Sequence, residues 1–226
     1  KILIILKSRI AANIAFVGSH FAMSHPLRAP MVKALGAGGF QGVYTLVSFA
    51  TLAWVYFAFT AAPPADLPGS GDVGWIAATI ITLPAMILLA GSFMGNPALP
   101  TPMAEAQARA EPKGVFKVTR HPMMWGIALW AASHIVLFWS TRTLVTALAM
   151  GILALVGAKL QDGKKEALMG AAWAEWESKT SYWPRWGKLL SVGAVPLIAG
   201  TALWLGASWL HLFSADIPAG VWMWLG

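Results

Sequence analysis

The sequence predicts an all-α integral membrane protein that forms a single domain of six transmembrane helices over residues 1–226. Of its residues, 58% are hydrophobic and 11% are charged, whereas about a quarter of the residues in a soluble domain are charged. Several uncharged runs reach the roughly 17–25 residues that a helix needs to cross a bilayer. The net charge of +7 comes from basic residues between these runs, so it predicts membrane topology and not nucleic-acid binding.

Six uncharged runs define the predicted helices. They cover residues 10–27, 40–62, 73–104, 121–141, 143–158 and 189–214. Residues 1–6 form the lead-in to the first helix. The third helix has to end early, because Gly95 and Pro97 break it and leave a loop over about 95–120. The fifth run is short, but Arg142 and Lys159 at its ends can extend their side chains to the membrane interfaces.

Basic residues predict the orientation of the helices. Twelve Lys and Arg residues follow the first, third and fifth helices, while Lys1, Lys7, Arg9 and Arg142 lie on the opposite side. Cytoplasmic loops are enriched in Lys and Arg. Both termini are therefore expected on the non-cytoplasmic side.

The segment 162–188, between the fifth and sixth helices, predicts an interfacial amphipathic helix. Its tryptophans alternate with charged residues, and they are Trp173, Trp176, Trp183 and Trp186. Tryptophan is enriched at the level of the lipid headgroups, so membrane lipids are the expected partners of this segment. The alternative is a lid over a cytoplasm-facing site. Residues 217–224 are expected to form a second short segment at the membrane interface.

Histidines are the main candidates for chemistry in this chain. It has no cysteine, which excludes disulfides, thiolate nucleophiles and iron–sulfur sites. A neutral imidazole is a strong metal ligand that can enter a bilayer without charge. His20 lies near the middle of the first helix and His134 in the outer half of the fourth. Interhelical hydrogen bonding and metal ligation are both open for this pair.

The remaining histidines lie near helix ends. His25 and His121 each precede a proline at the cytoplasmic end of a helix, where they can cap the helix, bind lipid phosphate or bind a ligand. His211, near the external end of the sixth helix, is read as an interface residue. The six runs contain no carboxylate, which argues against an intramembrane proton relay, and no serine-hydrolase elbow is present.

Three segments carry a resemblance to a known family. Residues 18–28, 39–48 and above all 119–134, which reads TRHPMMWGIALWAASH, resemble the NnrU family over helices one to five. The family is named for a link to nitrite and nitric oxide reduction, and it includes the zeta-carotene isomerase of plants and cyanobacteria, a heme b protein with two histidine ligands. The resemblance implies a multi-pass protein of the bacterial inner membrane, with both termini periplasmic, that binds heme b.

The resemblance also implies site residues. His134 corresponds to one heme ligand, while both His20 and His25 align with the first-helix ligand. The two ligand nitrogens must lie on either side of one iron, at about 2 Å each. His20 is favoured, because its depth in the membrane is closer to that of His134 than the depth of His25 is. This interpretation requires His20 and His134 to face each other across one pocket. Trp130 shares a helix face with His134 and is a further cofactor contact.

Arg28 and Arg120 lie at the cytoplasmic side, where they are expected to pair with the heme propionates. The isomerase carries a cysteine three residues before its ligand, and that position is Ala131 here, so ligand switching by a thiolate is absent. If the chain is an isomerase, its substrate is an apolar polyene.

A second resemblance gives an alternative function. Arg120 and His121, together with residues 166–184, are similar to membrane methyltransferases of the isoprenylcysteine carboxyl methyltransferase type, which use S-adenosylmethionine. This interpretation makes His121 and Arg120 the catalytic candidates, in a cytoplasm-facing cavity. A third possibility is a non-enzymatic accessory subunit that packs a helix face against a protein partner, whose identity the sequence does not indicate.

Overall fold

The computed structural model describes residues 2–225, and every regular element in that range is helical. The long helices are α1 (Ile2–Ser24), α2 (Arg28–Thr60), α3 (Gly71–Gly91), α5 (Pro122–Leu137), α6 (Thr141–Met169) and α8 (Ala194–Ala215). Short helices join them: α4 (Ala104–Arg109), α7 (Ala171–Lys179) and 3-10 turns at Gly114–Lys117, Trp186–Ser191 and Gly220–Trp224. The all-α prediction is therefore confirmed for the described residues.

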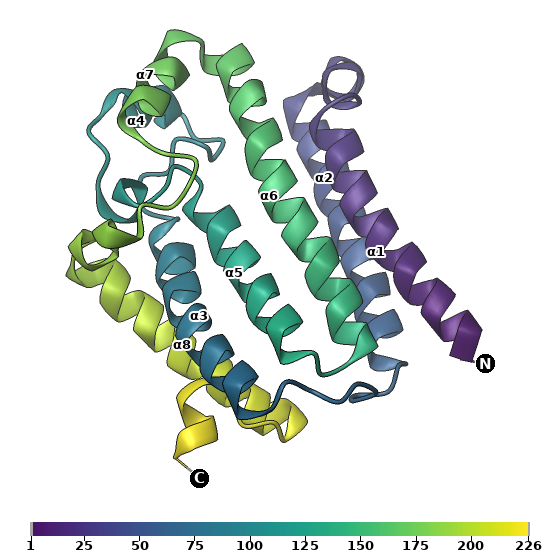
Figure 1. Ribbon diagram of the computed structural model, residues 1–226. Helices are drawn as coiled ribbons and strands as arrows, with labels where there is room; N and C mark the ends of the chain where they lie inside the picture. Colours follow the sequence, from purple (N-terminus) through teal and green to yellow (C-terminus); the bar gives the residue numbers. More distant parts are fainter. Residues whose placement is uncertain (1, 226) are drawn as a thin grey trace.

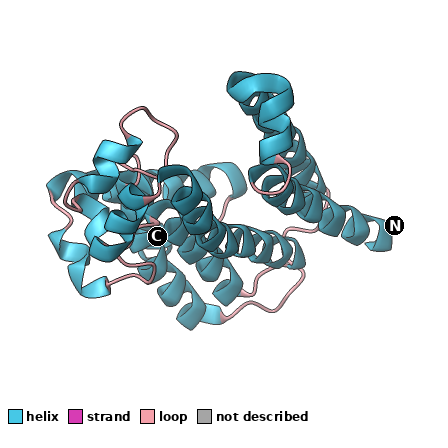
Figure 2. Ribbon diagram, turned by 90° about the horizontal axis from the view of Figure 1, so that it is seen from above, coloured by secondary structure: helices cyan, strands magenta, loops and turns pink. Residues whose placement is uncertain are grey.

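The long helices run alternately up and down, and both ends of the chain lie at the same end of the bundle (Figure 1). Helix α3 packs against both α5 and α8, and α5 packs against α6. The α1–α2 pair joins the others mainly through contacts between α1 and α6, and it stands to one side in the view along the bundle (Figure 2). Which end of the bundle faces the cytoplasm stays a prediction.

Four helices, α2, α3, α6 and α8, are long and apolar enough to cross a membrane. Helix α5 is apolar but has 16 residues, which gives about 24 Å at 1.5 Å per residue, less than the roughly 30 Å of a hydrocarbon core. The chain is thus an integral membrane protein by this criterion. Six complete spans remain a prediction.

Several helix boundaries differ from the predicted ones. Helix α2 begins at Arg28, in a segment expected to be a loop, and is interrupted where Gly36 adopts φ 71° and ψ 169°. A positive φ is accessible to glycine because it lacks a Cβ, so the chain changes direction there. Helix α6 continues well past Ala158 to Met169, because the charged residues at its end form a buried network instead of a loop.

The prediction of an interfacial amphipathic helix is wrong for its first two tryptophans. Residues 162–169 belong to α6, and α7 follows after Gly170. Trp173 and Trp176 are 0% and 2% exposed and form a hydrophobic core with Leu88, Val115 and Phe116. These tryptophans therefore pack against protein and do not lie at headgroup depth, whereas Trp183 and Trp186 are exposed.

Glycines allow α3 to approach α5 and α8 closely at one end of the bundle. A Cβ on Gly126, in the second turn of α5, would lie 2.8 Å from the carbonyl oxygen of Ala85. A Cβ on Gly200, in the second turn of α8, would lie 2.3 Å from the Cα of Ile87. Small residues permit such close helix packing in membranes. The opposite ends of α5 and α8 are left to frame a cavity.

Candidate functional site

The main cavity lies between α3, α5, α8 and the start of α6. Its volume is about 340 Å³, within the range of small-molecule and cofactor sites. The wall is largely apolar and aromatic, with Trp75, Met86, Trp130, Leu137, Trp139 and Trp204 among its residues. Trp204 is fixed by donating a hydrogen bond from Nε1 to Thr82 at 2.9 Å. The 3-10 turn at Gly220–Trp224 closes one side, since Gly220 also lines the cavity.

Two histidines, His134 and His211, contribute to this wall. His134 lies three residues before the end of α5 and His211 four residues before the end of α8. Both helices run towards the end of the bundle that holds the two termini (Figure 1), so the two side chains reach the same depth. Their ring centres are 6.3 Å apart. His211 is exposed, while His134 is partly buried.

Hydrogen bonds to the backbone orient both imidazoles. The Nδ1 of His134 lies 2.8 Å from the carbonyl oxygen of Trp130, and the Nδ1 of His211 lies 2.8 Å from that of Ala207. A carbonyl oxygen can only accept, so each Nδ1 carries the proton. The lone pair of each neutral ring is then on Nε2, which has no hydrogen-bond partner among the described residues. Histidines that bind metals are oriented in this way.

His20 is not part of this cavity. It lines a separate shallow pocket between α1 and α2, together with Phe16, Tyr44 and Ser48. Its Nδ1 donates to the carbonyl oxygen of Phe16 at 2.7 Å, and its Nε2 lies 3.4 Å from the hydroxyl of Ser48. The expected arrangement, with His20 and His134 facing each other across one pocket, is thus not what the structure has. His20 as an iron ligand stays a prediction.

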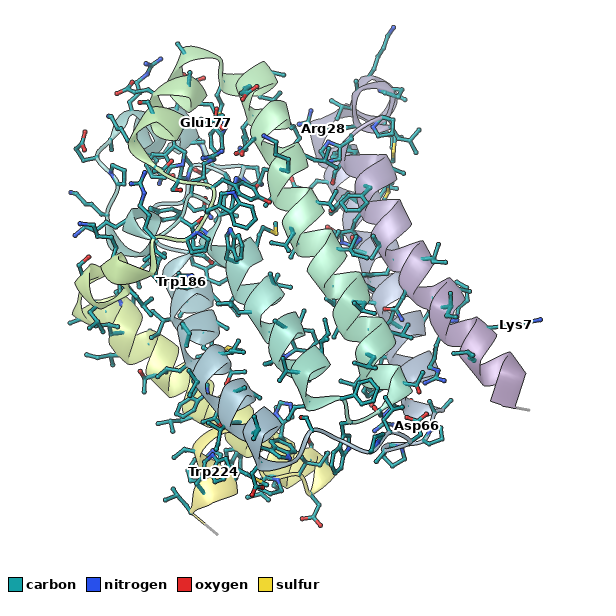
Figure 3. All side chains as sticks on the ribbon, viewed as in Figure 1. Lys7, Arg28, Asp66, Glu177, Trp186 and Trp224 are labelled. Carbon is teal, nitrogen blue, oxygen red and sulfur yellow. The ribbon has the colours of Figure 1, made fainter. Side chains whose placement is uncertain are left out.

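The other predicted cofactor residues divide between the cavity and the far end of the bundle. Trp130 does line the cavity, with its ring centre 4.4 Å from that of His134. His25 lies after the end of α1 and lines neither cavity; burial and the charge of Lys164 lower its pKa. Arg28 lies over the ring of Phe40, at the end of the bundle opposite Asp66 and Trp224 (Figure 3). The cavity has Arg142 in its wall instead.

Arg120 and His121 belong to a buried ionic network at that far end. Arg120 binds Asp162 through two hydrogen bonds, of 3.0 Å from Nε and 2.6 Å from Nη2, and also contacts Glu177 at 3.0 Å. The Nε2 of His121 lies 2.8 Å from Asp162. Burial raises the pKa of Glu177, although the charge of Arg120 opposes this shift. The network joins the ends of α5, α6 and α7.

The chain around Arg120 is also held by the segment that follows α7. The amide of Arg120 donates to the carbonyl of Ser181, and Nε1 of Trp125 donates to that of Tyr182. The predicted neighbourhood of Arg120, His121 and residues 173–184 is therefore present. It is closely packed, and neither of the two cavities described here is lined by it. A nucleotide-sized cavity, which methyl transfer requires, is not among them.

Sequence reasoning missed two residues of these sites. His211 was read as an interface residue, yet its position near the external end of its helix matches that of His134, and this shared depth is the signal that could have found it. Asp162 was assigned to a surface helix after the fifth span. It is 2% exposed, and its proximity to Arg120 depends on a tertiary contact that no local pattern reveals.

Comparison with known proteins supports the resemblance seen in the sequence. The family model described as NnrU protein matches residues 9–219, which includes both cavity histidines and the ionic network. Neither a curated protein nor a solved structure matches the chain. Because the match covers nearly the whole sequence, the chain belongs to the NnrU family.

Proposed function

We propose that this NnrU-family membrane protein binds heme b in the main cavity, with His134 and His211 as the two iron ligands. The separation of 6.3 Å between the two ring centres carries the proposal. An iron between two imidazoles lies about 2 Å from each nitrogen, and each nitrogen lies about 1.2 Å from its ring centre, which requires about 6.4 Å. The spacing of the two rings is therefore that of an imidazole pair on one iron, and ligation also requires both Nε2 atoms to turn toward the iron.

The number of ligands also favours a macrocycle over a bare metal ion. A bare ion in a protein usually takes at least about three side-chain ligands. Within residues 2–225, no group of three or more His, Asp or Glu residues could hold an ion. Heme iron needs only axial ligands, because the macrocycle supplies the equatorial nitrogens. Two imidazoles with free Nε2 atoms would be enough protein ligands to hold a heme.

His211 replaces His20 in this proposal for two reasons. His20 lies in another pocket, and its Nε2 is next to the hydroxyl of Ser48. His211 lies in the same cavity as His134, with its Nε2 available. Arg142, which lines the cavity, replaces Arg28 and Arg120 as the basic residue near the propionates.

Heme supplies ligand exchange and one-electron redox chemistry when bound. The residues of the chain would set the conditions for this chemistry. The carbonyls of Trp130 and Ala207 keep the proton on Nδ1. The hydrogen bonds also make each Nε2 a stronger electron-pair donor to a metal. The tryptophans of the wall exclude water and offer flat apolar surfaces to a macrocycle.

The test is a visible absorption spectrum of the purified protein, oxidised and dithionite-reduced, after expression with ample heme. The proposal predicts a low-spin spectrum with two axial histidines, lost in His134→Ala. The matched control is His121→Ala, because this histidine is held by Asp162 at the other end of the bundle. A protein that folds but stays colourless would contradict the proposal.

Cis–trans isomerisation of an apolar polyene is a second candidate function for the same site. The exposure of His211 favours it, because this side chain would be within reach of an apolar substrate that enters the cavity when heme is bound. Conversion of a cis polyene by heme-loaded protein, assayed by chromatography with His134→Ala as control, tests it. The alternative that the family name suggests, a role in nitrite or nitric oxide reduction, predicts nitric oxide binding without isomerisation.

A further inference from the structure

Arg9 is a buried cation that forms no ion pair with any described residue. It lies on α1, is 6% exposed, and its Nε and Nη1 atoms are buried without a hydrogen bond. One turn later, Asn13 donates to the carbonyl oxygen of Arg9 and leaves its own Oδ1 buried and unpaired. Arginine side chains are cationic in proteins. A buried charge of this kind requires a counter-ion.

Arg142, in the first turn of α6, is a second cation without an acidic partner. Its Nη1 donates to the carbonyl oxygen of Ala62 at 2.9 Å, and its guanidinium lies 4.4 Å from the centre of the Phe59 ring. Its Nε is buried and unpaired. Among the described residues no carboxylate forms an ion pair with Arg142 or Arg9, and Asp66 is the acidic residue whose charge acts on both from a longer distance.

The two arginines meet where α1, α2 and α6 come together. Asp66, in the loop after α2, accepts a hydrogen bond from the amide of Thr141 at 2.6 Å, next to Arg142. This bond is the main cause that lowers the pKa of Asp66, and the charge of Arg9 lowers it further. Figure 3 shows Asp66 at the end of the bundle near the start of α1. Arg142 therefore lies at the start of α6, one of the helices long and apolar enough to cross a membrane, and the electrostatic coupling of Arg9 to Asp66 places Arg9 near the same end of the bundle.

We infer that Arg9 and Arg142 form a subsite for the oxyanion head of an amphiphile, whose apolar part lies against the helices. Guanidinium groups recognise carboxylate and phosphate oxygens through paired hydrogen bonds. Both residues have nitrogens without a hydrogen-bond partner, and these nitrogens are enclosed by protein atoms, so each side chain has to turn toward the oxyanion to donate to it. Two sources of the oxyanion fit: the phosphate of a membrane lipid, and a carboxylate of the molecule in the main cavity, since Arg142 lines that cavity as well.

The test uses the full chain in detergent, without heme, and dioleoylphosphatidylglycerol as the probe. The control ligand is dioleoylglycerol, which has the same acyl chains and no phosphate. We expect the phosphate lipid to raise the Tm by several degrees and the control lipid to leave it unchanged. Arg9→Gln and Arg142→Gln abolish the shift, whereas Lys33→Gln, an exposed residue of α2 that removes the same charge, keeps it.

A second arm identifies the source of the oxyanion. If the carboxylates of heme are the ligand, the lipid shift is absent in every protein, and Arg142→Gln weakens binding of hemin about tenfold without changing binding of hemin dimethyl ester. Arg9→Lys and Arg142→Lys keep the charge and serve where the glutamine variants do not fold.

The inference is overturned if neither the lipid shift nor the preference for hemin over its ester depends on either arginine. The lipid arm needs no heme, so it is independent of the proposed function.

Discussion

His134 and His211 come from helices separated in the chain by α6 and α7, yet their ring centres lie 6.3 Å apart. Each imidazole donates Nδ1–H to a carbonyl one turn earlier in its own helix. This arrangement leaves the two Nε2 atoms available to a ligand in the cavity.

Removing His211 should leave a space that free imidazole can fill. We expect His211→Gly to bind heme with one protein ligand, because His134 and its hydrogen bond to Trp130 remain. Imidazole added at millimolar concentration should restore the low-spin spectrum, followed by absorbance. In His20→Gly, imidazole should have no effect, since the spectrum of that variant is expected to be that of the parent protein.

The contact between Gly200 and α3 should be essential for stability. An added Cβ would lie 2.3 Å from the Cα of Ile87, so Gly200→Ala has to push α8 away from α3 and should cost about 1–3 kcal/mol. Gly206→Ala on the same helix is the control, because nothing lies within 4 Å of its added Cβ. Equal Tm values for the two variants would show that α3 and α8 do not pack as described.

The network around Asp162 should stabilise the fold strongly. Asp162→Asn removes the charge that pairs with Arg120 and His121 and leaves a buried guanidinium without its main partner. Breaking a buried ion pair costs about 3–5 kcal/mol, measured here by denaturant or thermal unfolding. Glu175→Gln, in an exposed pair with Arg109, should have little effect. Heme binding by any folded Asp162→Asn protein should be retained, because the network lies away from the cavity.

The bond between Asp66 and Thr141 predicts a pH-dependent stability. The amide of Thr141 lowers the pKa of Asp66. For a carboxylate with a lowered folded-state pKa, the stabilisation is present above the unfolded pKa of about 4 and is lost as the pH falls through the folded value. Asp66→Asn should therefore lower the Tm at about pH 7, and the difference from the parent protein should shrink as the pH falls below the unfolded pKa of about 4. Glu105→Gln, on the exposed side of α4, should show no such difference.

Composition and uncharged runs were sufficient to predict the helical membrane fold. The ends of the individual helices were harder to predict from the sequence. Lys165 is buried and donates a hydrogen bond to the carbonyl of Pro97. This charged residue therefore belongs to α6, although hydropathy alone ends the span before it. Trp173 and Trp176 have the spacing of an interfacial helix in sequence but are buried by α3 and the loop after it. The pattern of charged residues and tryptophans shows that a segment is amphipathic. It does not show whether its apolar side chains pack against lipid or against protein.

The candidate site was predicted in part. His134 and Trp130 were found from the motif over residues 119–134, and they do lie together in the main cavity. The partner of His134 was sought on the first helix, because the resemblance covers helices one to five and the sixth helix was left without a motif. Helix packing decides which histidines meet, and the approach of α8 to α3 through Gly200 is a tertiary feature.

The most direct test of the central claim compares hemin titrations of His211→Ala and His20→Ala, each followed by the absorbance of the ferric protein. We predict that His20→Ala keeps the affinity and the low-spin spectrum of the parent protein, while His211→Ala loses the low-spin spectrum and binds hemin more weakly. The opposite result, with the spectrum lost in His20→Ala and retained in His211→Ala, would contradict the assignment of His134 and His211 as the heme ligands.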